Sequence, residues 1–313
     1  MNVLVWHVHG SWMTTFVQGP HTYFVPLVDG RGPDGRGRAR TYAWPDNVIE
    51  IDLATSQRTP YDIVVLQRPH ELQTLAPQWL GPQRKLGVDV AAVYVEHDAP
   101  PGSVAEMRHG VADREDVTLV HVTNFNALFW ESGRTRTLVV EHAIVDPGYR
   151  YSGDIPHTAV VINEAARRGR IVGTDLLDRF ATVAPIDLFG MGAGALGGIE
   201  DVPQARLHDE MAKRRAYLHP NRWTSLGLSL LEAMFLGMPV VALATTEAHE
   251  AIPPGTGACS TSVPHLLDAL RSFHRDPARA CDAGLRAREY ATARYALSRF
   301  VCEWNDIFSE VAA

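Results

Sequence analysis

The strongest constraint on the fold is one stretch, residues 219–241, which runs HPNRWTSLGLSLLEAMFLGMPVV. The apolar segment just before it is predicted to form a buried strand, which Pro220 ends. A helix is then predicted over about residues 226–236, with Thr224 or Ser225 as its N-cap. The stretch therefore begins as a strand followed by a turn and a helix.

The end of this helix leads into a second strand. Gly237 fits the left-handed position after a last helical turn, and Pro239 prevents continuation. Residues 240–243 (VVAL) then favour a buried strand, so the stretch forms one strand–helix–strand unit of a parallel sheet. The helix N-terminus lies at the carboxyl end of a strand, where its N–H groups and partial positive charge suit a phosphate.

Glu232 interrupts the apolar run of the predicted helix. Ser225, Ser229 and Glu232 are spaced i, i+4 and i+7, so we expect them to share one face. Such a face meets either water or a polar ligand whose hydroxyls donate to the carboxylate. The spacing alone does not separate these two interpretations.

The same stretch resembles the donor-sugar signature of retaining GT-B glycosyltransferases, especially family 4. The signature is roughly P-S-x-x-E-G-F-G-L-x-x-L-E-A-M-A-x-G-x-P-V-V, and the chain matches it in register at Pro220, Gly227-Leu228, Leu231-Glu232-Ala233-Met234, Gly237 and Pro239-Val240-Val241. The resemblance implies that Glu232 binds the nucleotide ribose and that the helix start, Leu226 to Leu228, faces the diphosphate. The family's sugar-binding glutamate falls on Thr224, with Ser225 beside it, and this departure leaves the identity of the donor sugar open.

Length and composition exclude several classes of protein. A chain of 313 residues predicts two domains, and a net charge of −7 argues against a general nucleic-acid binder. The three cysteines have no C-x-x-C spacing, so neither a disulfide framework nor a zinc site is indicated. The N-terminus has no leader-like pattern and no apolar run approaches 18 residues, so a cytoplasmic protein is expected. Peripheral membrane contact stays open.

The order of elements predicts an α/β protein. Apolar strands alternate with short helices in both halves, which is typical of parallel sheets covered on both faces. Strands are predicted in the first half at residues 2–8, 21–28, 47–53, 62–67, 88–95, 118–122 and 138–140, and in the second half at 157–162, 186–190 and in the strand–helix–strand unit.

A loop-rich segment, residues 146–154, separates the two halves. We therefore expect a first domain over 1–152 and a second over 153–295. The resemblance implies a GT-B fold, in which two Rossmann-like domains face a central cleft. It also implies that the last helix, residues 296–313, packs back on the first domain.

An arginine-rich turn follows the first strand of the second half. Arg167, Arg168 and Arg170 offer guanidinium donors that suit a diphosphate, although an exposed basic turn is the ordinary alternative. The family has G-R-L-x-x-x-K-G here, and counting back from Gly173 places its arginine on Arg167. Its lysine falls on Val172, so the resemblance implies that Arg170 or Arg168 takes over that role.

His97 ends an apolar strand in the sequence YVEHDAP. A structural histidine at a domain edge is the plain interpretation. In the resembling family a histidine in this place lies under the donor sugar, so the resemblance implies a catalytic His97. Because side chains alternate along a strand, Glu96 and Asp98 should point away from the imidazole.

The first strand is followed by a polar loop. The family's equivalent loop is glycine-rich and closes over the donor phosphate, which implies Gly10 and Ser11, with Thr14, as donors here. His7 and His9 are spaced i, i+2 and would share a strand face, but no third metal ligand is indicated.

Two further segments carry alternatives. Residues 192–197 spell G-x-G-x-x-G, but a dinucleotide site requires this motif to open a helix, and we predict a loop. Residues 30–40 (GRGPDGRGRAR) are predicted to be a mobile, solvated loop, with anion binding for an acceptor as the alternative.

Together these patterns and the resemblance predict a metal-independent, retaining glycosyltransferase without a cofactor. Its co-substrate is a nucleotide diphosphate sugar, and its acceptor is a glycan, a lipid or a small molecule. The alternatives are an NAD- or sugar-phosphate-dependent enzyme that uses the glycine loop, and a non-catalytic GT-B relative that acts as a binding partner.

Overall fold

The computed structural model describes residues 1–313 and divides into two compact units. The first comprises Met1–Ala143 and Leu297–Ala313, and the second comprises Ile144–Ala296. The boundary lies before the loop-rich segment rather than at residues 152 and 153. The reason is that this segment packs on the second unit: Ile144 is buried in its core, and the Tyr151 N–H donates to the Leu236 carbonyl at 3.0 Å.

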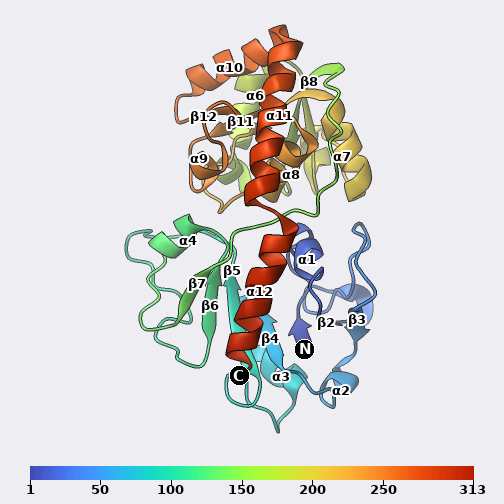
Figure 1. The fold of residues 1–313 in the computed structure, drawn as a ribbon, viewed down its shortest axis with the longest axis vertical. Helices are drawn as coiled ribbons and strands as arrows, with labels where there is room; N and C mark the ends of the chain where they lie inside the picture. Colours follow the sequence, from blue (N-terminus) through green and yellow to red (C-terminus); the bar gives the residue numbers. More distant parts are fainter. The chain divides into compact units, whose positions relative to one another are not determined.

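The first unit is built on a seven-stranded parallel sheet (Figure 1). All seven strands predicted for the first half are confirmed, and they lie in the order β3-β2-β1-β4-β5-β6-β7. Most are short apolar runs buried on both faces, as expected for a covered parallel sheet. Their bounds are β1 Asn2–Val5, β2 Thr22–Pro26, β3 Val48–Ile51, β4 Ile63–Leu66, β5 Ala91–Glu96, β6 Thr118–His121 and β7 Thr137–Val139.

The helices of the first unit are short except for the last one. They are α1 Gly10–Phe16, α2 Leu53–Ser56, α3 Ala76–Leu80, α4 Asn124–Phe129 and α12 Leu297–Val311. Helix α12 belongs to this unit because its aromatic stripe packs on α1: the Trp304 ring lies 5.0 Å from that of Phe16 and 6.0 Å from that of Trp12. Aromatic pairs at such separations add to the stabilisation from buried area.

The second unit contains a five-stranded parallel sheet in the order β12-β11-β10-β8-β9. Strand β12 was not predicted from the sequence. The strands are β8 Ile155–Val161, β9 Ile186–Phe189, β10 Arg214–His219, β11 Val240–Leu243 and β12 Gly257–Ser260; the helices are α5 Ala165–Arg168, α6 Leu177–Ala181, α7 Gln204–Lys213, α8 Leu228–Leu236, α9 Ala248–Ala251, α10 Val263–Arg275 and α11 Pro277–Arg294.

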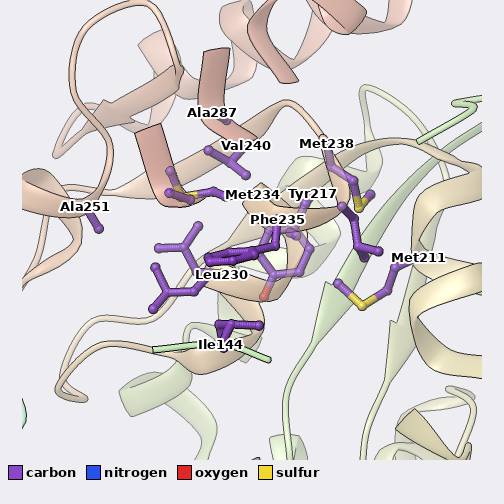
Figure 2. Close-up of a cluster of buried hydrophobic side chains, with 14 of the residues drawn as sticks. Ile144, Met211, Tyr217, Leu230, Met234, Phe235, Met238, Val240, Ala251 and Ala287 are labelled. Atoms are coloured by element: carbon purple, nitrogen blue, oxygen red, sulfur yellow. The ribbon is translucent and has the colours of Figure 1, made fainter. Parts of the chain in front are cut away.

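Helix α8 lies at the centre of the second unit's core. Every residue from Leu230 to Leu236 is buried, so this helix has apolar contacts on almost all sides. Figure 2 shows Leu230, Met234 and Phe235 in the same cluster as Tyr217 of β10 and Ala287 of α11. Gly237 ends the helix with φ +84°, as predicted.

Each sheet has one point at which the strand order reverses. In the first unit it lies between β1 and β4, and in the second it lies between β8 and β10. In open parallel sheets, ligands bind outside the carboxyl ends of the strands at such points. No helix in either unit is both long and apolar enough to cross a membrane.

Candidate functional site

The segment that leads into α8 differs from its prediction. The helix begins at Leu228 with Gly227 as N-cap, and no side chain caps it, so Thr224 and Ser225 are not caps. A close contact explains the glycine at the N-cap: a side chain at Gly227 would overlap the buried His219 ring. Leu226 is buried and keeps its place in the core, but it lies in the loop before the helix.

This loop is fixed by hydrogen bonds to neighbouring segments. The N–H groups of Arg222 and Trp223 donate to the Ile171 carbonyl at 2.8 and 3.1 Å, and the Thr246 hydroxyl donates to the Ser225 carbonyl at 2.6 Å. The Asn221 amide donates weakly to the Thr224 hydroxyl at 3.4 Å. Backbone and side-chain bonds therefore hold the loop in one conformation.

Glu232 is buried on the side of α8 that faces α7. The Gln204 amide donates to its Oε1 at 3.0 Å, and His208 Nε2 lies 3.8 Å from its Oε2. The predicted shared face fails, because Ser225 lies outside the helix and Ser229 accepts a hydrogen bond from the Tyr217 hydroxyl at 2.8 Å. Gln204 and His208 were missed, since no sequence pattern connects them to Glu232.

The arginine-rich turn lies at the carboxyl end of β8. Arg167 is largely exposed in α5, and its Nε donates to Glu164 Oε2 at 3.2 Å. Arg170 follows in a short 3₁₀ turn, and its Nη1 donates to Asp175 Oδ2 at 3.1 Å. Val172, which falls on the position of the family's lysine, is fully buried, so its side chain is not accessible to a ligand.

Arg222, which the sequence did not single out, joins this basic group from the loop after β10. It donates to the Arg170 carbonyl at 2.8 Å and shares the Asp175 carboxylate with Arg170. Gly173 allows the two loops to touch: its φ is +75°, and a side chain there would overlap the Pro220 carbonyl. Arginines therefore lie on both sides of the reversal point between β8 and β10.

The G-x-G-x-x-G segment does not open an α-helix. Its residues 193–196 form one 3₁₀ turn, and Gly192 and Gly197 both have left-handed φ values, +72° and +73°. The Gly194 N–H donates to the Glu200 carboxylate. The predicted loop is confirmed, and the geometry of a dinucleotide fingerprint is absent.

His97 lies at the carboxyl end of β5 and is almost completely buried. Its ring packs edge-on against Trp12 at 4.9 Å, and its Nε2 has no hydrogen-bond partner within the protein. Burial, reinforced by the neighbouring His9 and His142, lowers the pKa of His97 well below 6.5, so the ring is neutral at physiological pH. Glu96 points away, as predicted, and contacts His109 Nε2 at 3.0 Å.

The loop after β1 is already helical at Gly10. Gly10 begins α1, with His9 as N-cap and Ser11 in the first turn. Thr14 is engaged internally, because its hydroxyl donates to the Gly10 carbonyl at 2.7 Å and accepts from Trp44 at 2.9 Å. The polar loop predicted after the first strand is therefore a helix start.

His7 and His9 have different neighbours, so they do not form a pair. His7 Nδ1 lies 2.9 Å from the Gly37 carbonyl, whereas the His9 ring packs on that of His97. Across both units, no group of three or more His, Cys, Asp or Glu side chains could hold a metal ion.

Comparisons with known proteins agree with this geometry. Residues 170–276 match the family described as Glycosyl transferases group 1. No curated protein sequence matches the chain. The matched segment includes the basic loop from Arg170 onward, the whole loop that leads into α8, and Glu232.

Solved structures share the fold at low sequence identity. Sucrose-phosphate synthase from Thermosynechococcus elongatus is 14% identical, with a TM-score of 0.70 over 99% of this chain and 98% of that one. Anabaena HepE in complex with UDP-glucose is 15% identical, with a TM-score of 0.67 over 99% and 100%. TarM is 12% identical, with a TM-score of 0.59 over 79% of this chain, and the match spans about half of TarM (54%).

Proposed function

We propose that this chain is a glycosyltransferase that uses a nucleotide diphosphate sugar. The chain has the GT-B fold and resembles the group 1 glycosyltransferases over residues 170–276. The sugar passes to an acceptor with retention of configuration. The observation that carries the proposal is that the N-terminus of α8 and the group of Arg167, Arg170 and Arg222 lie at one sheet edge, and that the same helix carries buried Glu232.

In this proposal the second unit binds the donor. Glu232 accepts hydrogen bonds from the ribose, and its contact with Gln204 orients the carboxylate. The uridine nucleotide of the HepE complex makes UDP the first nucleotide to test.

Arg167, Arg170 and the start of α8 at Leu228 bind the diphosphate. The leaving phosphate gains negative charge as the sugar departs, and guanidinium groups and helix N–H dipoles stabilise such charge when they are held in place beforehand. The proposed reaction therefore needs no metal, and a chelator should leave activity intact. Gly10 and Ser11 of α1 are assigned as secondary phosphate contacts.

His97 of the first unit is assigned to the donor sugar. A neutral imidazole can accept or donate one hydrogen bond without placing a positive charge beside an oxocarbenium-like sugar. A non-catalytic relative is the second candidate, because Thr224 replaces the carboxylate that would grip the sugar. It predicts nucleotide binding without any hydrolysis or transfer of the sugar.

The test combines binding and turnover. UDP, GDP and ADP sugars are titrated into the full chain by calorimetry, and slow donor hydrolysis is followed by nucleotide release. Glu232→Ala should lower donor affinity by about 1.5–3 kcal/mol, since hydrogen bonds to a charged acceptor are lost. Glu289→Ala, an exposed carboxylate of the same unit, is the matched control. Equal affinities in both variants and the wild type would remove Glu232 from the site.

A further inference from the structure

The loop between β2 and β3 contains an unusual concentration of positive charge. Four arginines and one aspartate lie within residues 30–40, in a chain whose net charge is −7. The sequence predicted a mobile, solvated loop, but two of these arginines are bound into the fold. Arg31 Nη1 donates to Glu50 Oε1 at 2.8 Å, and Arg38 Nη2 donates to the Trp44 carbonyl at 2.7 Å.

The backbone between these two arginines is also fixed. Arg36 forms a β-bridge with Leu27, and its carbonyl accepts from Arg31 Nη1 at 2.9 Å. Gly37 has φ +65°, and a side chain there would overlap the Glu50 carboxylate. The Glu50 carboxylate also accepts from the Arg38 N–H at 2.8 Å. Two arginines and one glutamate thus set the conformation of the loop.

Arg36 and Arg40 differ from Arg31 and Arg38 in their surroundings. Both are exposed, and neither forms an ion pair or a side-chain hydrogen bond with the protein. A loop whose own cations already include two structural arginines does not need two more for its stability. Exposed guanidiniums without an ion pair suit an anion, and the backbone that carries Arg36 is fixed by its β-bridge with Leu27, so a ligand is the natural partner.

The loop lies over the carboxyl ends of β1 and β4, where the strand order of the first unit reverses. It contacts His7 after β1, through the Gly37 carbonyl at 2.9 Å. It also contacts the residues after β4, because Asp34 lies 3.5 Å from Arg68 and from His70. This is the edge at which an open parallel sheet binds its ligand.

We propose that Arg36 and Arg40 bind a phosphate group of the acceptor. The inference rests on the proposed function, because the ligand is the molecule that receives the sugar. Two guanidinium charges match the charge of one phosphate monoester, which is about −1.5 to −2. Each guanidinium can donate two parallel hydrogen bonds to phosphate oxygens. The phosphate belongs either to a small phosphate ester or to a lipid headgroup.

The experiment measures anion binding on the full chain with UDP present in saturating amount, so that the donor site is filled. Glycerol 3-phosphate is titrated in one arm, and vesicles that contain phosphatidic acid, a lipid whose headgroup is a phosphate monoester, are titrated in the other, with phosphatidylcholine vesicles as reference. The double variant Arg36→Gln/Arg40→Gln should bind the anion about tenfold or more weakly. Arg58→Gln, another exposed arginine of the same unit without an ion pair, should match the wild type.

Each outcome decides the proposal. Loss of glycerol 3-phosphate binding in the double variant supports a small phosphate ester, and loss confined to the vesicle arm supports a lipid headgroup. No anion binding by the wild type in either arm, or equal binding by the wild type and the double variant, overturns it. Thermal unfolding should be unchanged, because both side chains are exposed. UDP affinity should also be unchanged, so failure to bind UDP would count against the proposed function alone.

Discussion

The imidazole of His97 packs on that of His9, with ring centroids 4.2 Å apart and planes tilted by 41°. Two imidazoles this close together cannot both carry a proton without strong repulsion. His142 lies nearby as a third buried imidazole, and Arg299 donates to its carbonyl at 2.7 Å. Burial, together with the charges of His9 and Arg299, lowers the pKa of His142 to about 3.

This cluster makes stability depend on pH below neutrality. The folded pKa of His142 is about 3, lower than its unfolded value of 6.5, so the unfolded chain binds the proton more readily. The contribution of neutral His142 to the free energy of unfolding is therefore complete above pH 6.5 and is lost as the pH falls toward 3. Between pH 7 and 5 the loss that comes from His142 should be about 2 kcal/mol, measured by urea unfolding.

His142→Asn should reduce this pH dependence, while His265→Asn should not, because His265 is exposed. His97 belongs to the same group, since burial lowers its pKa well below 6.5. An unfolding free energy that stays constant from pH 7 to pH 5 would show that these imidazoles bind protons as readily in the folded chain as in the unfolded one.

Arg167→Ala tests the phosphate contact separately from the rest of the nucleotide. Removing a guanidinium should lower the affinity for UDP by about tenfold or more and leave the affinity for uridine nearly unchanged, because only UDP carries the phosphates. Calorimetric titration of both ligands gives the comparison. Arg179→Ala, an exposed arginine of the same unit, is the control. If the affinities for UDP and uridine fall equally, Arg167 has a structural role.

Gly284 tests how tightly α11 packs on the end of α8. A side chain at this buried position would overlap the carbonyl of Gly237 and approach the carbonyl carbon of Met238 at 3.0 Å. Because backbone atoms cannot swing aside as a side chain can, Gly284→Ala should cost about 1–3 kcal/mol or more. The measurement is thermal or urea unfolding of the full chain, so that variants in either unit can be compared.

Gly110→Ala is the matched control for this substitution. A Cβ atom added at Gly110 would have no heavy atom within 4 Å, and the φ of this residue is not left-handed. The two variants should therefore differ clearly in unfolding temperature. Similar temperatures would mean that α11 shifts away from α8 at little cost.

Local pattern was enough to predict most strands and the general position of α8. Runs such as IVVL at β4 and VVAL at β11 are entirely apolar and rich in β-branched residues, which favour buried strands. Strand β12 has the sequence GACS, whose glycine and alanine are poor strand formers, and its pairing with β11 is the only signal for it. Tertiary pairing overrode the local preference there.

The parts of the site that depend on distant contacts could not be predicted. Gly227 at the N-cap of α8 is required by the close approach of His219, which is a contact between the end of β10 and the helix start. Glu50 fixes the arginine loop from the following strand, and Gln204 reaches Glu232 from another helix. None of these pairs has a fixed sequence spacing, so each required the three-dimensional structure.

Thr224 is the position where this chain departs most from the family it resembles. A glutamate there would grip hydroxyls of the donor sugar, and a charge-assisted hydrogen bond is roughly twice as strong as the neutral bond that threonine offers. The structure gives Thr224 one weak contact, at 3.4 Å from the Asn221 amide. Ser225 is buried, and its carbonyl is held by Thr246, so it is a poor substitute for the missing carboxylate.

We therefore expect the donor to be a deoxy or otherwise modified sugar that lacks the gripped hydroxyl. Thr224→Glu should leave UDP affinity nearly unchanged, because Glu232 and the arginine group are untouched. It should shift the preference among UDP sugars toward those with a full set of hydroxyls, measured as the ratio of kcat/KM values for paired donors. Thr224→Ser keeps the hydroxyl and is the control. Loss of UDP binding in Thr224→Glu would mean that this position faces the nucleotide, and an unaltered donor preference would place it away from the sugar.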